Sequence, residues 1–409
     1  MRVLLSTYDS RGGVEPLLAV AVQLRALGAE ALVAAPPDEE FADRAAAFGI
    51  PLVAFGPSVR AVTTSATRSS EEDLRGHILG LLAAQFDTVA AAAQGCDALV
   101  STALVWTSAG ARSVSDKLGI PYVYASYHPT HLPSPYHPPP EFVGRTTGAN
   151  EIENRVMWEH NARTANALFG PTLNSHRASI GLAPVNDVRS YAYTDRPWLA
   201  ADPTLGPWQQ LADLAVVQTG AWLLPDDRPL SVELEQFLDA GPVPVFLGFG
   251  SMPLWGTKEV VPMAIEAIRG MGRRVLLSRG WADLAPSDDR DDCFVVGEVN
   301  QQALFGRVAA VVHHGGAGTT TTAARAGVPQ LVVPQGADQV YWARRVVELE
   351  IGGACDGPTP PPGALPAALE VVLGDDIRAR AQAVGGAINA DGAEVAAKLL
   401  IDVVSRGAS

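Results

Sequence analysis

A short apolar strand, a turn and a helix follow one another repeatedly along this chain of 409 residues. Residues 3–5 precede a turn at 9–13, a stretch with apolar residues at helical spacing that ends at Gly28, and a second apolar run. The same order recurs over residues 97–124 and 245–277. Short apolar strands that alternate with helices are typical of a parallel sheet covered on both faces. The pattern predicts an α/β fold of the Rossmann type.

The length of the chain predicts two such units, because one hydrophobic core rarely organises more than about 250 to 300 residues. Both halves open with an apolar strand and a glycine turn. Residues 206–214, which begin with Gly-Pro, are the expected linker. We therefore expect an N-terminal domain at 1–208 and a C-terminal domain at 216–409.

Charge and cysteine content argue against several classes of protein. The chain has 30 basic and 44 acidic residues, a net charge of −14, and no basic stripe that could hold a nucleic acid. Cys96, Cys293 and Cys355 are widely spaced, which predicts reduced thiols rather than disulfides or a zinc site. No run of about 18 apolar residues occurs. We expect a cytoplasmic protein without stable membrane insertion.

The segment from Val308 to Pro334 carries the clearest chemical signal. An apolar strand leads into the turn His313 to Gly318, and a helix is expected from Thr319 to about Ala326. Glycines let a backbone approach a bulky anion, and a helix N-terminus offers unpaired N–H groups. The segment predicts a phosphate site, in which the Thr319 hydroxyl both caps the helix and contacts the ligand. The alternative is a turn that only forms a tight corner.

Two well-known phosphate motifs do not fit this turn. The glycines are more compressed than in the nicotinamide fingerprint, and no acidic residue ends the next strand. A P-loop needs Lys followed by Ser or Thr after the glycines, and no such Lys-Ser/Thr pair follows them here.

A family resemblance rests on this turn together with its neighbours. His313 to Thr320, with Gly248 to Ser251 before it and Pro334 to Gln339 after it, resembles the donor-site signature of GT-B enzymes among plant and bacterial small-molecule glycosyltransferases. Further segments resemble the actinomycete enzymes that glycosylate vancomycin-group antibiotics: 10–12, 174–177, 193–195, 217–222, 278–283 and 297–300. The likeness spans nearly the whole chain.

The resemblance implies two Rossmann-like domains whose parallel sheets face each other across a cleft, with the last helix, 392–404, packing back on the N-terminal domain. It implies inverting, metal-independent transfer of a hexose-type sugar from a dTDP- or UDP-sugar, which is a co-substrate rather than a cofactor. The acceptor would be a hydroxyl of a natural-product aglycone, glycopeptide-like or otherwise polyphenolic or macrocyclic. Donors fixed around the leaving diphosphate would stabilise the transition state.

The resemblance also assigns donor residues by motif position. The phosphate ligands would be Ser251, His314, Gly316, Gly318 and Thr319, joined by Ser10 and Arg11 from the other domain. Val299 would meet the base through its backbone, with Arg279 and Trp281 as further nucleotide-site candidates. Asp338 and Gln339 would bind the sugar hydroxyls.

The general base is where the sequence departs from the family pattern. In the antibiotic enzymes the first turn ends Ser-Arg-Gly-Asp, which places a carboxylate beside the acceptor hydroxyl, whereas this chain has Gly13. Asp9 and Asp338 are the candidate catalytic residues. His128 and His131, which follow a strand, are candidate acceptor-pocket bases. A phenolic acceptor would depend less on any base.

Other interpretations stay open at this point. Asp288 to Asp292 contains the spacing of metal-dependent transferases, but a solvated turn is expected, and no metal site is predicted. Trp198, Trp208 and Trp222 could form an acceptor platform or pack between domains. A sugar-nucleotide epimerase of the same fold, or a catalytically silent protein that binds sugar nucleotide, would share the diphosphate site.

Overall fold

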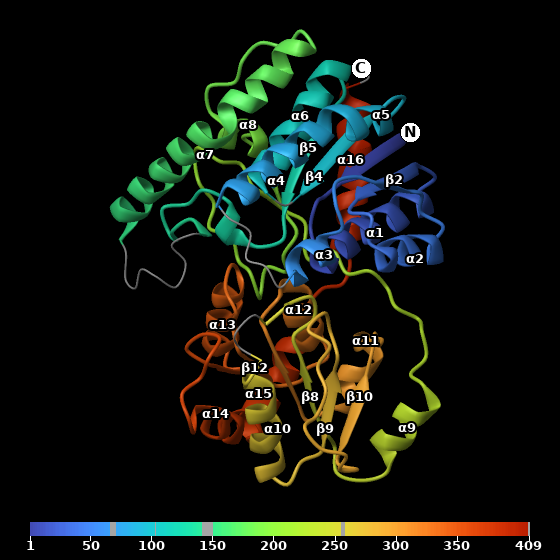
Figure 1. Ribbon diagram of the computed structural model, residues 1–409, viewed down its shortest axis with the longest axis vertical. Helices are drawn as coiled ribbons and strands as arrows, with labels where there is room; N and C mark the ends of the chain where they lie inside the picture. Colours follow the sequence, from blue (N-terminus) through green and yellow to red (C-terminus); the bar gives the residue numbers. More distant parts are fainter. Residues whose placement is uncertain (66–70, 103, 141–149, 255–257, 408–409) are drawn as a thin grey trace. The chain divides into compact units, whose positions relative to one another are not determined.

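The computed structural model describes residues 1–65, 71–102, 104–140, 150–254 and 258–407, the side chains of 71–75 and 407 excepted. The chain forms two compact units, and Figure 1 shows a sheet with flanking helices in each. The first comprises Met1–Pro203, Pro207–Leu224 and Ala390–Ser409, and the second comprises Thr204–Gly206 and Pro225–Asn389. The chain enters the second unit briefly at Thr204–Gly206 and again from Pro225, and all of the expected linker at 206–214 except Gly206 belongs to the first unit.

The first unit has a parallel sheet of seven strands in the order β3-β2-β1-β4-β5-β6-β7. Its strands are β1 (Arg2–Ser6), β2 (Glu30–Ala35), β3 (Leu52–Ala54), β4 (Ala98–Thr102), β5 (Tyr122–Ser126), β6 (Trp198–Leu199) and β7 (Val217–Gln218). Its helices are α1 (Arg11–Ala26), α2 (Glu39–Ala47), α3 (Val59–Thr64), α4 (Glu71–Ala84), α5 (Ala90–Ala92), α6 (Val105–Leu118), α7 (Glu151–Ser179), α8 (Val188–Tyr193) and α16 (Gly392–Gly407), with a π-helical turn, η1 (Gln85–Val89), and a 3₁₀ turn, η2 (Pro129–His131).

The second unit has a parallel sheet of six strands in the order β10-β9-β8-β11-β12-β13. Its strands are β8 (Val245–Gly248), β9 (Val275–Ser278), β10 (Cys293–Val296), β11 (Ala310–His313), β12 (Gln330–Val332) and β13 (Gly352–Ala354). Its helices are α9 (Val232–Asp239), α10 (Val260–Gly270), α11 (Gln301–Leu304), α12 (Ala317–Arg325), α13 (Gln339–Glu348), α14 (Ala364–Val372) and α15 (Asp375–Gly385), with a 3₁₀ turn, η4 (Phe305–Arg307).

The apolar strands of the second unit are buried because both faces of the sheet are covered. Val245 and Leu247 pack into one core cluster with helix residues such as Ile265, whereas the intervening Phe246 packs into a second cluster with Phe305. Successive side chains of a strand point to opposite faces, so a strand buried on both sides is apolar throughout. The predicted α/β fold with two parallel sheets is confirmed.

Short-range signals fix the ends of α1 and α7, and packing fixes the place of α16. Gly28 follows Leu27, the C-cap residue of α1, and has φ +84°, as expected of a glycine that ends a helix. α7 begins after Asn150, whose side chain accepts from the backbone N–H groups of Ile152 and Glu153. The C-terminal helix α16 packs against α1 in the first unit, and Figure 1 shows the two side by side.

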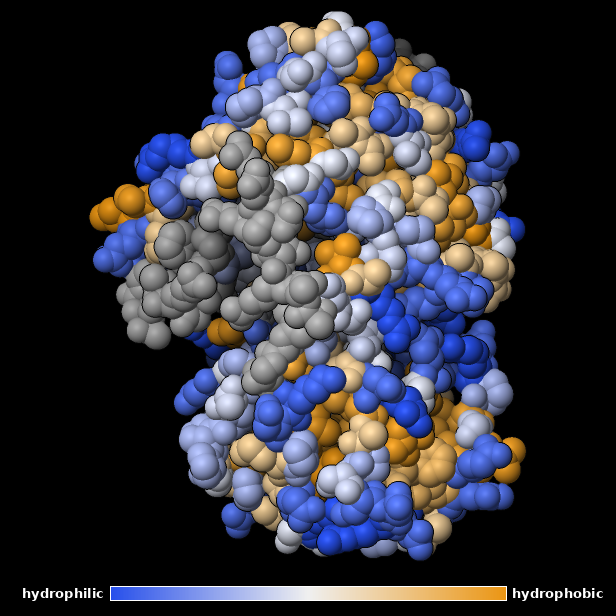
Figure 2. All heavy atoms as spheres, in the orientation of Figure 1, coloured by the Kyte–Doolittle hydropathy of each residue, from blue (hydrophilic) through white to orange (hydrophobic). Residues whose placement is uncertain are grey.

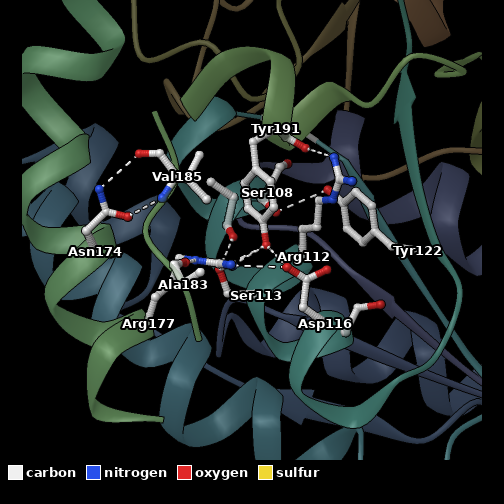
Figure 3. Close-up of polar contacts among 12 residues, drawn as sticks. Ser108, Arg112, Ser113, Asp116, Tyr122, Asn174, Arg177, Ala183, Val185 and Tyr191 are labelled. Carbon is white, nitrogen blue, oxygen red and sulfur yellow. Dashed lines mark hydrogen bonds and ion pairs between the residues drawn. The ribbon is translucent and has the colours of Figure 1, made fainter. Parts of the chain in front are cut away.

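The helical arm formed by α7 and α8 is fastened to α6 by a buried cation (Figure 3). Arg177 is 6% exposed; its guanidinium donates to Ser113 Oγ (3.0 Å) and Asp116 Oδ2 (3.1 Å) and to the carbonyl of Ala183 (2.8 Å). Three residues earlier, Asn174 exchanges two hydrogen bonds with the backbone of Val185. These residues of the 174–177 motif therefore hold α7 and the segment that follows it against α6 in the first unit.

Charged and polar residues are interspersed with apolar ones over the face of the molecule drawn in Figure 2. Within the described part of the chain, no helix is both long and apolar enough to span a membrane.

Candidate functional site

The candidate site of the second unit lies at the switch point of the sheet, where consecutive strands are added on opposite sides of β8. β8 lies between β9 and β11, so the loops after β8 and β11 leave the same edge of the sheet in opposite directions. Ligands of open parallel sheets bind at the carboxyl ends of strands at such a point. The two loops are Phe249 to Ser251 and His314 to Gly316, the segments that the sequence assigned to a diphosphate.

The buried His313 side chain fixes the path of the glycine-rich turn. Its Nδ1 accepts from the backbone N–H of Gly315 (3.1 Å), and its Nε2 lies 3.0 Å from Gln330 Oε1. The proton therefore sits on Nε2 and is donated to Gln330. Burial lowers the pKa of His313 to about 3, so the ring is neutral at pH 7. Gly315 has φ +91°, and a Cβ there would lie 2.7 Å from Val332.

The N-terminus of α12 is open. The helix begins at Ala317, two residues before the predicted start, and its N-cap is Gly316, which has no side chain to cap the first turn. The predicted capping role of Thr319 is therefore wrong, because Thr319 lies in the first turn of the helix. Gly318 is exposed, and a Cβ there would meet nothing within 4 Å. Uncapped N–H groups beside open space suit an anion.

His314 lines this open end from the other side. The ring is half-buried; a Cβ at Gly316 would lie 2.5 Å from its Nε2, and one at Gly250 would lie 3.3 Å from its Cε1. Its Nδ1 is buried and has no hydrogen-bond partner. Burial lowers the pKa of His314 to about 4, opposed in part by the charge of Asp338. A neutral imidazole with one N–H to donate therefore lies beside the N-terminus of α12.

The loops after β8, β9 and β10 complete this edge of the sheet. The Trp281 N–H donates to the Gly250 carbonyl (2.9 Å), and the Arg279 N–H donates to Val296 (3.0 Å). Arg279 is an exposed side chain, 3.6 Å from Asp283, whereas Trp281 is only 9% exposed. Ser251 and Val299 are both half-buried. Their predicted nucleotide contacts stay predictions.

The pair Asp338-Gln339 has partners within the protein. Gln339 is buried; its Oε1 accepts from the Gln335 N–H (2.7 Å), and its Nε2 donates to the thioether of Met252 (3.3 Å). Gln339 therefore ties the loop after β12 to the loop after β8. The half-buried Asp338 accepts from the indole N–H of Trp342 (3.0 Å). Sugar binding by the pair stays a prediction, with Asp338 the better placed side chain.

The first unit has a corresponding turn between β1 and α1. Ser10 is the N-cap of α1, but its side chain makes no capping bond. Arg11 pairs with Glu15 one helical turn on (3.0 Å). Asp9 Oδ1 accepts from the Ser10 N–H (2.6 Å). The Tyr127 hydroxyl donates to the Gly13 carbonyl (2.9 Å), which joins the carboxyl ends of β5 and β1.

Histidines in and just before the Pro-rich loop 129–140, which follows β5, make aromatic contacts. His128 is buried, with Nδ1 2.7 Å from Thr130 Oγ1, and its ring centroid lies 4.0 Å from that of His131. Burial lowers the pKa of His128 to about 3, which makes it a weak base. Further along the loop, the ring of His137 contacts Trp158 and Trp208 at 6.0 and 6.2 Å. Residues 141–149, which follow this loop, lie outside the described residues.

Two sets of residues that resembled functional features have structural roles instead. Asp288 and Asp292 both pair with the guanidinium of Arg269, at 2.8 Å each, so this acidic run is an ion-pair cluster rather than a freely solvated turn. Trp198 and Trp222 are buried against each other in the first unit, with ring centroids 6.5 Å apart.

Sequence reasoning missed three residues that shape these sites: Gln330, Tyr127 and His137. Gln330 offered a signal, because a polar residue in an otherwise apolar strand needs a buried partner. Tyr127 and His137 offered none.

Known structures define the class of the protein. The chain matches the glycotransferase of kitacinnamycin with a TM-score of 0.71, at 21% identity, over 98% of both chains. It matches the calicheamicin glycosyltransferase with a TM-score of 0.70, at 18% identity, over 100% of this chain and 99% of the other. Two parallel α/β units with these neighbours define the GT-B fold.

Sequence relatives define the family. The chain is 55% identical to the vancomycin aglycone glucosyltransferase of Amycolatopsis orientalis, over 99% of this chain and 98% of that protein. It is 50% identical, with the same coverage, to the dTDP-epi-vancosaminyltransferase of that organism. Residues 290–400 match the family model of the erythromycin biosynthesis protein CIII-like C-terminal domain. The chain belongs to the family of antibiotic glycosyltransferases that includes the vancomycin-group enzymes.

Proposed function

We propose that the chain transfers a sugar from a dTDP- or UDP-sugar to a hydroxyl of a glycopeptide-type aglycone, with inversion and without a metal. The observation that carries the proposal is the uncapped, glycine-lined N-terminus of α12 with the neutral imidazole of His314 beside it. Together with the relatives that act on the vancomycin aglycone, this supports a diphosphate donor and a glycopeptide acceptor.

The reaction chemistry follows from where charge develops. As the bond between the anomeric carbon and the diphosphate breaks, negative charge grows on the leaving oxygens. N–H groups of α12 and the ring of His314, fixed before the reaction, stabilise that charge more than the ground state. Asp338, whose charge raises the pKa of His314, is the residue proposed to orient the sugar hydroxyls.

The acceptor is proposed to bind in the first unit. The cluster of His128, His131, His137 and Trp208 offers aromatic surface, and both His137 Nε2 and Trp208 Nε1 are buried without a hydrogen-bond partner. Such atoms suit the phenol groups of a polyphenolic aglycone, which can both donate and accept.

The test is a mass-spectrometric assay of the purified protein with vancomycin aglycone and with dTDP-glucose or UDP-glucose. A monoglycosylated product, formed in the presence of EDTA, is expected, and NMR of the isolated product should show an axial-to-equatorial change at the anomeric carbon. Binding of dTDP without product for any donor and acceptor would identify a silent sugar-nucleotide-binding protein. An epimerised nucleotide sugar formed without acceptor would identify an epimerase.

A further inference from the structure

Asp9 fills the space that a side chain at position 13 would need. A Cβ built on Gly13 would lie 2.4 Å from Asp9 Cβ and 2.7 Å from both Asp9 Cγ and Oδ2. Real Cβ atoms do not approach heavy atoms so closely, so Asp9 in this position and any side chain at 13 exclude each other. The carboxylate of Asp9 therefore takes the place of a side chain on the first turn of α1.

The surroundings hold this carboxylate in place at the carboxyl end of the central strand. Asp9 Oδ1 accepts from the Ser10 N–H, while Oδ2 lies over Gly13. Tyr127, from the end of β5, hydrogen bonds to both the Gly13 carbonyl and Thr102 Oγ1 (3.2 Å), the latter at the end of β4. The charge of Asp9 contributes to a raised pKa of Tyr127, which places the two groups near each other. β1 and β4 flank the switch point of this sheet, where ligands bind.

We propose that Asp9 is the general base of the transfer reaction and that it replaces the carboxylate absent at Gly13. This inference rests on the proposed function. The acceptor oxygen forms a bond to the anomeric carbon, and the bond from that carbon to the diphosphate breaks. Its electron pair leaves with the diphosphate, and the acceptor proton moves to the Asp9 carboxylate.

Other groups of the two units are less suited to take this proton. The Tyr127 hydroxyl donates its own proton to the Gly13 carbonyl, and burial raises its pKa. His128 is buried with Nδ1 bonded to Thr130, and its pKa is about 3. Asp338 accepts from the Trp342 indole and lies beside His314 in the second unit, where the donor is proposed to bind.

The test compares Asp9→Asn with the exchange variant Asp9→Gly/Gly13→Asp. The amide oxygen of Asn at position 9 can still accept the hydrogen bond from the Ser10 N–H, but the amide cannot take a proton. With vancomycin aglycone, kcat should therefore fall roughly a hundredfold or more. The affinity for dTDP and the melting temperature should stay near wild type, and the acidic limb of the pH profile of kcat/KM should disappear. The exchange variant puts the carboxylate at position 13. Its kcat should be at least tenfold higher than that of Asp9→Asn, and the acidic limb of its pH profile should return.

Two further variants separate catalysis from folding. Gly13→Asp alone crowds two carboxylates and should melt below wild type, while the exposed Asp43→Asn should leave all measurements unchanged. The proposal is overturned if the wild type transfers sugar and Asp9→Asn keeps more than half of its kcat. It is also overturned if the exchange variant is no more active than Asp9→Asn. A wild type that transfers no sugar overturns the proposed function instead.

Discussion

The two units contain the same strand–turn–helix corner at their switch points, but only the corner of the first unit has an anionic side chain over the first turn of its helix. After β11, the first turn of α12 is lined by glycines, and its N-cap has no side chain. After β1, the first turn of α1 is preceded by Asp9, which accepts from the Ser10 N–H and covers Gly13. A helix N-terminus favours negative charge in both cases.

The difference shows how one backbone motif serves two tasks. α12 leaves its N–H groups for an anion from solution, which suits the donor diphosphate. α1 already has an anion of its own, which suits the uptake of a proton. Arg11, one of the predicted phosphate ligands, forms an ion pair with Glu15, which partly neutralises its charge within the helix.

The largest effect on dTDP binding is expected when a carboxylate is added to the first turn of α12, which has no capping side chain. Gly318 and Gly12 occupy the same second position of their helices, and neither has a heavy atom within 4 Å of a built Cβ. Gly318→Asp should weaken dTDP binding several hundredfold, since opposed like charges cost several kcal/mol. Calorimetric titration measures this affinity.

Matched variants show whether charge causes the effect. Gly318→Asn has the same size without charge and should lose less than tenfold, as should Gly12→Asp in the first corner. Equal losses for Gly318→Asp and Gly318→Asn would mean that space is limiting. An equal loss for Gly12→Asp would mean that the first corner takes part in anion binding, as predicted for Ser10 and Arg11.

The next largest effect concerns the donor group beside the open corner. His314→Ala should lower kcat about a hundredfold, because removing one preorganised donor to a developing anion has an effect of this size. Steady-state kinetics with saturating aglycone measure it. Unchanged kcat would remove His314 from the proposed mechanism.

Both units should make stability depend on pH through histidines that are neutral in the folded protein. Burial lowers the pKa of His313 and His128 to about 3, and that of His314 and His137 to about 4. Between pH 6.5 and these values the unfolded chain binds more protons than the folded one. The free energy of unfolding therefore falls as the pH drops below 6.5, by about 1.4 kcal/mol per pH unit for each histidine.

Urea unfolding at pH 6.0 and 5.0 measures this slope. His313→Gln should reduce it by one histidine's share, whereas the same change at the exposed His160 should leave it unaltered. An identical slope in His313→Gln and wild type would contradict the neutral state of His313.

The smallest effect should come from the hydroxyls of the two corners. Thr319→Val removes one hydroxyl near the anion site and should raise KM for the donor about threefold to tenfold, the size of a single hydrogen bond. Ser10→Ala should leave stability within about 0.5 kcal/mol, because the Ser10 side chain makes no capping bond. A larger stability loss for Ser10→Ala would mean that its hydroxyl supports the first corner.

The fold and its elements were predictable because their signals are local. The apolar runs and Gly28 after α1 each act within a few residues of the element they define. The glycine-rich turn indicated an anion site for the same reason. The start of α12 was predicted two residues too late, because Gly316 caps it by backbone conformation alone.

The sequence by itself determined the two α/β units, the glycine-rich turn and the absence of the usual acid at Gly13. Only the tertiary structure showed that Gln330 orients His313, that Gln339 ties two loops together, and that Asp9 occupies the space above Gly13. The physical reason is that helical and strand periodicity follow from neighbouring residues. Hydrogen-bond partners and excluded space depend on which loops the strand order brings to the same edge of a sheet.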